Sequence, residues 1–111
     1  MTTIFLDKWS QAQTVLDAVV AATADPSGAS TTYRPNPNAG GVIAFVSFSG
    51  TSTATLQLWV EDAGQWYKGD KASLNSAGGD IALMFPVFSR PGITFSLTAK
   101  SGAGAITVKV L

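Results

Sequence analysis

The chain has 111 residues, a formal net charge of zero, and neither cysteine nor histidine. These counts exclude disulfides, zinc sites built from cysteine or histidine, thiol nucleophiles and catalytic triads that need histidine. The balanced charge also argues against nucleic-acid binding, which needs an excess of lysine and arginine on one face. Only 13% of the residues are charged, against about 25% in an ordinary globular domain. Because low charge favours association, we expect a homo-oligomer or a larger assembly.

The first residues are predicted to form a short arm, and the rest of the chain a single domain. Residues 1–13 hold an apolar segment, Ile4, Phe5, Leu6 and Trp9, ahead of the first predicted strand. Such an arm either packs on its own domain or crosses to a neighbouring molecule. We therefore treat these side chains as candidate interface residues, and residues 14–111 as one domain.

The next segment can be interpreted in two ways. Residues 14–24 are rich in β-branched side chains, which favour a strand. Apolar residues also recur there at helical spacing, and Ser10 with Gln13 resembles a capping box, so a helix remains the alternative. A short strand is expected around residues 30–33. The prolines of residues 34–41 predict a loop, because they exclude a helix there.

Three later segments alternate strictly between apolar and polar residues: 54–62, 93–100 and 105–111. In a strand this pattern buries one face and leaves the other in solvent. Turns rich in glycine, proline and serine separate these and the neighbouring segments about every 8–12 residues. The pattern indicates an all-β domain.

Two further segments are apolar on both faces. Residues 41–48 predict a central strand or one with a covered outer face, and Pro86 places residues 81–88 at a sheet edge or bulge because it lacks a ladder donor. A further strand is expected after the turn at residues 62–64. The candidates number about eight, which predicts a single antiparallel β-sandwich of jelly-roll or immunoglobulin-like type.

The acidic residues do not form a recognisable catalytic pair. Glu61 and Asp62 are adjacent, so on a strand they point to opposite faces. Asp62, Asp70 and Asp80 could meet at one end of the domain, but the chain has no Asp-x-Asp-x-Asp-Gly run for calcium. The glycines match neither phosphate-binding motif, and no apolar run reaches the roughly 18 residues of a membrane helix. We expect no enzymatic activity, cofactor, metal site or membrane partner.

The aromatic residues indicate a binding role instead. Trp59 lies on the polar register of its strand, which predicts an exposed ring that anchors an interface or stacks on a sugar, unless a loop or the arm covers it. Met84 and Phe88 share one face of their segment and are expected to join Trp59 in a patch. Trp66 and Tyr67 point to opposite faces, so at least one of them should lie in the core.

Residues 48–67 read Phe-Ser-Gly-Thr-Ser-Thr-Ala-Thr-Leu-Gln-Leu-Trp-Val-Glu-Asp-Ala-Gly-Gln-Trp-Tyr, and Ile-x-Phe-x-Leu and Ile-Thr-Val-x-Val strands follow at 93–97 and 106–110. This order resembles that of small virion proteins of tailed bacteriophages, which carry a Gly-x-x-x-Ala-Thr-Leu-Gln strand, an Asp-Gly turn and a Trp or Trp-Tyr. Here Ala63 separates the aspartate from the glycine. The resemblance implies an all-β structural subunit, often trimeric, with Trp66 packed in the core.

We therefore expect a non-enzymatic virion protein of the capsid decoration or cement type, assembled in the host cytoplasm. It would bind neighbouring capsid subunits through apolar contacts and form a homo-oligomer, with a trimer favoured. The candidate contact residues are Ile4, Phe5, Leu6, Trp9, Trp59, Met84 and Phe88. The alternatives are a tail or fibre accessory protein, or a carbohydrate-binding sandwich. In the latter, Trp59, Tyr33 or Trp66 would stack on sugars and Asn36, Asn38 or Asp62 would form hydrogen bonds.

Overall fold

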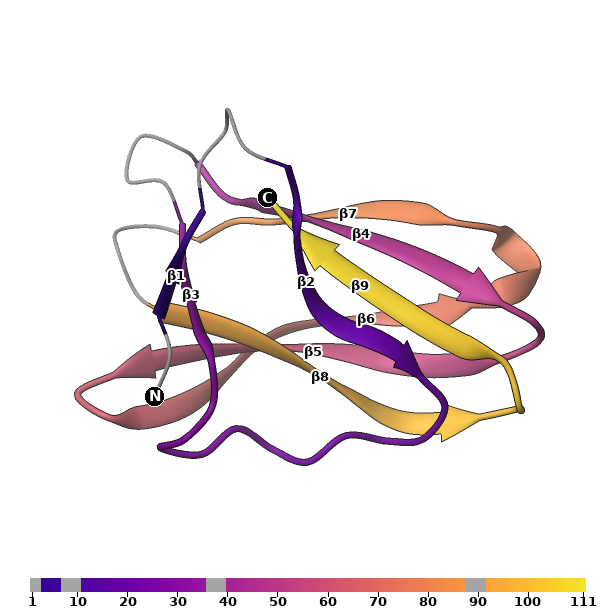
Figure 1. Cartoon of the computed structure of the whole chain (residues 1–111), viewed down its shortest axis with the longest axis horizontal. Helices are drawn as coiled ribbons and strands as arrows, with labels where there is room; N and C mark the ends of the chain where they lie inside the picture. Colours follow the sequence, from indigo (N-terminus) through magenta and orange to yellow (C-terminus); the bar gives the residue numbers. More distant parts are fainter. Residues whose placement is uncertain (1–2, 7–10, 36–39, 88–91) are drawn as a thin grey trace.

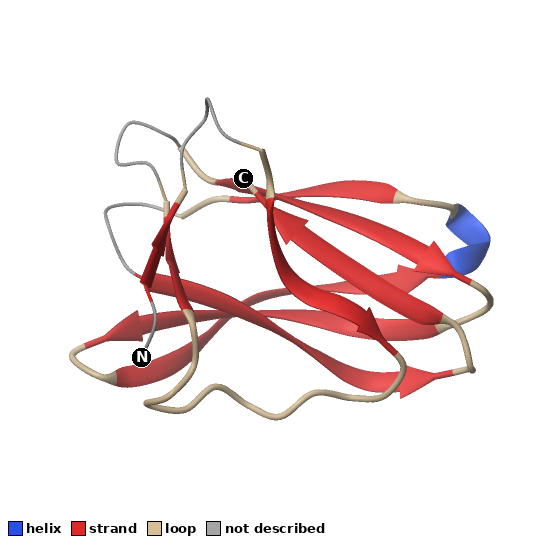
Figure 2. Ribbon diagram, in the orientation of Figure 1, coloured by secondary structure: helices blue, strands red, loops and turns tan. Residues whose placement is uncertain are grey.

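A computed structural model describes residues 3–6, 11–35, 40–87 and 92–111 of the chain (Figure 1). The regular structure of these residues consists of strands and one short 3-10 turn at Ser76–Gly78, and loops connect them (Figure 2). The strands are β1 (Thr3–Phe5), β2 (Gln13–Val19), β3 (Thr32–Arg34), β4 (Val42–Ser49), β5 (Thr53–Asp62), β6 (Gln65–Asn75), β7 (Ile81–Phe85), β8 (Gly92–Ser101) and β9 (Ala105–Val110). The predicted all-β class is confirmed.

The strands form two sheets, of order β1-β3-β8-β5-β6 and β2-β9-β4-β7. The antiparallel pairs are nested along the chain: β5 pairs with β6, β4 with β7, β3 with β8, and β2 with β9. Two further antiparallel pairings, β4 with β9 and β5 with β8, join these strand pairs side by side within each sheet. The arrangement is compatible with a β-sandwich.

One strand pair departs from the expected antiparallel pattern. β1 pairs with β3 in parallel, with Ile4 opposite Tyr33. The intervening strand β2 belongs to the other sheet, so the chain crosses between the sheets twice and enters β3 in the direction of β1. The arm therefore contributes an edge strand to its own domain.

Residues 14–24 are a strand only in their first part. β2 covers Gln13–Val19, which excludes the helical alternative, and residues 20–24 belong to the connection that follows. The strand expected around residues 30–33 is β3, at Thr32–Arg34. The prediction of an edge strand from Pro86 is confirmed, because β7 ends at Phe85 and lies at the edge of the four-stranded sheet.

The strictly alternating segments supply the core as predicted. Leu56 and Leu58 of β5 are buried together with alternate residues of β4, β8 and β9 in one cluster between the sheets. Phe85 of β7 packs edge-on against Phe95 of β8, with 5.2 Å between the ring centroids. The buried Tyr33 hydroxyl donates a hydrogen bond to the Thr14 carbonyl at 3.1 Å, which links β3 of one sheet to β2 of the other.

The turn between β5 and β6 has an unusual residue. Asp62 pairs with Gln65, and the two residues between them, Ala63 and Gly64, have φ of 52° and 82°. Two positive φ values define a type I′ turn, which matches the twist of the strands and favours Asn-Gly or Asp-Gly. Alanine in this conformation costs roughly 1–2 kcal/mol. The Glu61 carboxylate partly offsets the cost by accepting a hydrogen bond from the Gly64 amide at 3.2 Å.

Candidate interaction surface

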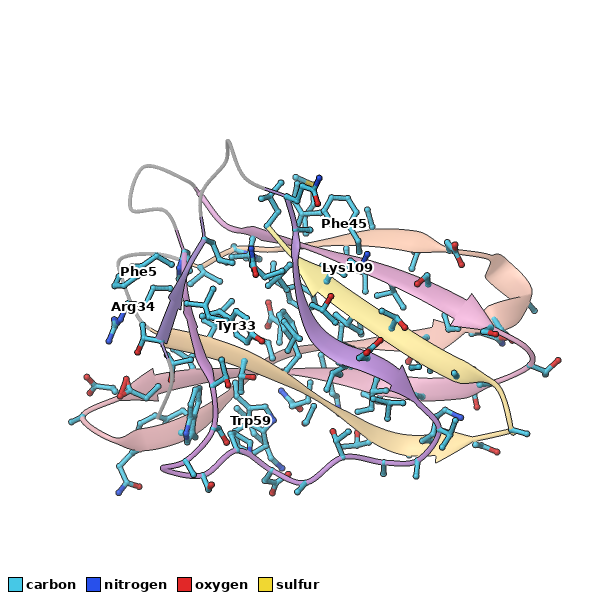
Figure 3. The ribbon with its side chains drawn as sticks, viewed as in Figure 1. Phe5, Tyr33, Arg34, Phe45, Trp59 and Lys109 are labelled. Atoms are coloured by element: carbon cyan, nitrogen blue, oxygen red, sulfur yellow. The ribbon has the colours of Figure 1, made fainter. Side chains whose placement is uncertain are left out.

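The outer face of the five-stranded sheet holds a buried tryptophan. Trp59 is only 7% exposed, its indole N–H donates to the Ser96 hydroxyl at 2.8 Å, and Lys68 Nζ lies 5.8 Å from its ring centroid (Figure 3). Of the two expectations for Trp59, an exposed ring or a ring covered by its own chain, the structure shows the covered ring. Trp59 lies on the outward register, as predicted, but the tertiary structure covers that register.

The cover includes the connection between β2 and β3, residues 20–31, which we call the strap. The Thr23 amide donates to the Leu97 carbonyl at 2.9 Å, and the Leu97 amide donates to the Thr23 hydroxyl at 2.8 Å. Further along, the Ser27 carbonyl accepts a hydrogen bond from the Trp66 indole at 3.0 Å. Leu97 belongs to β8 and Trp66 to β6, on either side of β5. The strap therefore runs from the edge of β8 to the Trp66 ring, which lies on the same outer face as Trp59.

Neither aromatic residue at the start of β6 belongs to the buried core. Trp66 is half-buried on the outer face, because it lies opposite Glu61 and shares the side of Trp59. Tyr67 is exposed. The β5–β6 hairpin reaches beyond the ends of β4, β7 and β9 (Figure 1), so no described strand of the other sheet faces its inward register near the tip. The expectation that one of the two would be in the core, and that Trp66 would be it, is wrong.

The outer face of the four-stranded sheet is different, because it exposes apolar side chains. Ile43 lies opposite Met84, and Phe45 lies opposite both Ala82 and Lys109. Directly opposed residues share a face, and this face alternates with the buried Val42, Ala44 and Val46. We call these outward residues, together with Leu111 opposite Ile43, the open face: Ile43, Phe45, Ala82, Met84, Lys109 and Leu111.

The exposure of the open face is uneven. Met84 is 79% exposed and Phe45 40% exposed, and Phe45 stands beside Lys109 in Figure 3. Two shallow hollows flank this face. One, of about 470 Å³, lies beside Ile43 and Met84, and the other, of about 390 Å³, beside Phe45 and Lys109. An apolar surface with hollows and a single cation is suited to contact with another macromolecule.

The predicted contact residues are separated by the fold. Leu6 is buried and its amide donates to the Arg34 carbonyl at 2.8 Å, while Ile4 packs against the core and Phe5 is exposed. Trp9 and Phe88 lie outside the described residues. Met84 is exposed but belongs to the sheet that does not carry Trp59, so the expected patch of the two does not form.

Sequence reasoning missed Ile43, Phe45 and Lys109. A signal was available, since residues 41–48 are apolar on both registers. β4 is central, as that pattern predicted. However, its outer register is not fully covered, because Phe45 remains 40% exposed.

Polar chemistry is sparse on the described surface. Within residues 3–6, 11–35, 40–87 and 92–111 the structure contains no cluster of three acidic side chains that could hold a metal. The Asp80 carboxylate instead accepts a hydrogen bond from the Phe48 amide at 3.1 Å. Burial raises the pKa of Tyr33 above its ordinary value of 10.0 and leaves this ring unavailable to a sugar. Asn36 and Asn38 lie outside the described residues.

Comparison with protein-family models, curated proteins and solved structures finds no significant match to this chain. In the same described ranges, no helix has the length and apolar character needed to cross a bilayer.

Proposed function

We propose that this protein is a non-enzymatic structural subunit of a virion, of the capsid decoration or cement type. In this role the open face binds a neighbouring shell protein. The observation that carries the proposal is the difference between the two outer faces, one covered by the strap and one left apolar. The resemblance of residues 48–67 to phage virion proteins supports the setting, which is the particle assembled in the host cytoplasm.

We further propose that the connectivity is that of a jelly roll. The nested pairs β2–β9, β3–β8, β4–β7 and β5–β6 are those of one long antiparallel ribbon rolled into two sheets. Jelly rolls occur in viral capsid proteins and in lectins. This is an analogy at the level of the fold, and it supports the proposal without defining a site.

The free energy available from burial of the open face favours many weak contacts with shell proteins over one strong contact. Full burial of one large apolar side chain contributes about 1.5–3 kcal/mol, and Met84 has most of that gain still available because it is 79% exposed. Phe45 is already more than half-buried and gains less. A stable isolated interface buries roughly 1,200–2,000 Å². Copies arranged on one shell would gain avidity from repetition.

The test is quantitative mass spectrometry of purified particles from the phage or prophage that encodes the chain. We expect a copy number comparable to that of the major shell protein. A few copies per particle would instead indicate the tail or fibre alternative. Absence from the particles would contradict the proposal.

A matched pair of variants tests the open face in the same particles. Phe45→Asp should lower incorporation strongly, because it places a charge in the apolar contact. Tyr67→Asp, at an exposed aromatic position on the other sheet, should leave incorporation unchanged. Equal incorporation of both variants would exclude the open face as the contact.

A further inference from the structure

The four edge strands of the two sheets differ in how they avoid pairing with other chains. Exposed edges are normally protected by charges, prolines, bulges or short length. β1 is only three residues long. β2 carries Asp17 and two register shifts, and β6 carries a register shift with Lys68, Asp70 and Lys71. Each of these three edges therefore has a recognisable protective feature.

β7 has none of these features between Ile81 and Phe85. Its sequence is Ile-Ala-Leu-Met-Phe, without charge or proline, and it pairs with β4 in continuous register. No described segment pairs with its other side. That side lines an open groove of about 660 Å³ between β7 and the edge of β6, so it is accessible.

The hydrogen bonds of β4 show which backbone groups of β7 are free. Ile43 and Leu111 exchange both backbone bonds at 3.0 Å, so the odd-numbered residues of β4 direct their N–H and C=O toward β9. The even-numbered residues therefore face β7, and the Phe48 amide, which donates to Asp80, agrees with this alternation. Ala44 consequently bonds Leu83. It follows that Ala82 and Met84 point their N–H and C=O away from β4, into the groove.

We propose that β7 pairs antiparallel with β7 of a second copy about a two-fold axis at Leu83. In this register Ala82 lies opposite Met84 of the second copy and exchanges both backbone bonds with it, and symmetry repeats the pair. The two four-stranded sheets then become one continuous sheet. The contact is closed, since each copy uses the same strand.

The side chains suit this register. The small Ala82 opposes the large Met84 of the second copy on the outer side, where Met84 is otherwise 79% exposed. On the inner side Ile81 opposes Phe85 of the second copy. Ile81 is 47% exposed although it lies on the inward register, so a second copy would complete its burial. No like charges oppose each other, because the strand has none.

The size of the contact predicts a weak association. A five-residue ladder with its flanking side chains buries less than the roughly 1,200 Å² of a standard stable interface. We therefore expect a monomer–dimer equilibrium that depends on concentration. The β7 pairing rests on the proposed assembly role, and it specifies one partner, a second copy of the chain, and the two-fold symmetry of the contact.

The first test is amide hydrogen exchange, followed by NMR, of the wild-type chain over a range of concentrations. The amides of Ile81, Leu83 and Phe85 should be protected throughout, because they bond β4. Those of Ala82 and Met84 should exchange rapidly at low concentration and become protected as the dimer forms. Rapid exchange of Ala82 and Met84 under conditions where sedimentation shows a dimer would overturn the proposal, and so would a monomer at all concentrations.

The second test compares Ala82→Pro with Ala82→Val by analytical ultracentrifugation. Proline removes an amide that bonds nothing within the domain, so the fold should persist as judged by circular dichroism. It removes half of the intermolecular N–H donors, which should raise the dimer dissociation constant about tenfold or more. Valine keeps the amide and should keep the dimer. Equal association of two folded variants would contradict the edge pairing.

These outcomes are separable from those of the proposed function. Self-association is measured on the isolated chain, whereas incorporation is measured on particles with Phe45→Asp. A dimer without incorporation would contradict only the virion role, and incorporation of a strictly monomeric chain would contradict only the β7 pairing.

Discussion

The two outer faces of the molecule each carry an aromatic side chain, but only one of these side chains is buried. β5 presents Trp59 on its outward register and β4 presents Phe45 on its own. The strap bonds β8 and the Trp66 ring on the side of the five-stranded sheet where Trp59 is buried, whereas Phe45 stays 40% exposed. An aromatic residue on an outward register therefore does not by itself show whether that face is covered. Whether its own chain covers it depends on a loop far away in the sequence.

Truncation of the two aromatic side chains should show the largest difference between the two faces. Trp59→Ala should destabilise the fold by about 3–5 kcal/mol, because it removes a large buried side chain and leaves a cavity. Phe45→Ala should cost about 1 kcal/mol or less, since the ring is only partly buried. Urea unfolding of the two variants measures both values. Equal losses of unfolding free energy would contradict the conclusion that Trp59 is buried and Phe45 is only partly buried.

A smaller effect is expected at Tyr33, which joins the two sheets. Tyr33→Phe removes the hydrogen bond to the Thr14 carbonyl and should cost about 1 kcal/mol at neutral pH. Because burial raises the pKa of Tyr33 in the folded state, its neutral form is favoured there. The associated stability is fully present below pH 10.0 and is lost as the pH rises through the folded pKa.

The wild type should therefore lose stability above pH 10.0 more steeply than Tyr33→Phe does. Urea midpoints measured across that range give the comparison. Tyr67→Phe, at an exposed ring, is the matched control and should follow the wild type. If the urea midpoints of Tyr33→Phe and wild type fall in parallel as the pH rises, Tyr33 is not the cause of the loss of stability.

The smallest effect concerns the attachment of the strap itself. Trp66→Phe removes the indole donor to the Ser27 carbonyl and should cost about 0.5–1 kcal/mol. The strap remains attached at Thr23, so Trp59 should stay buried. Urea unfolding gives the cost, and tryptophan fluorescence, measured with Trp9 also replaced by phenylalanine so that only Trp59 emits, reports the burial. A shift of the remaining emission to that of exposed indole would show that the Ser27 contact alone holds the cover in place.

Local patterns predicted the strands but not their partners. Period-two alternation located β5, β8 and β9, and Pro86 correctly indicated an edge strand. The parallel pairing of β1 with β3 could not be predicted, because it depends on which sheet receives β2. Trp59 and Leu6, two of the predicted contact residues, are buried within the chain for a related reason. Exposure depends on segments that are distant in the sequence, such as the strap.

The amino-acid sequence is enough to show that the protein is built from strands, several of them with one apolar and one polar register, since side-chain alternation acts over neighbouring residues. It also determined that no cysteine or histidine chemistry is available. The path of the chain in three dimensions determines that the outward register of Trp59 is buried and that the outward register of Phe45 forms the open face. It also leaves the outer side of β7 without a partner among the described strands. These outcomes depend on strand order and on the path of the strap, because burial is a property of what lies across a face rather than of the residues within it.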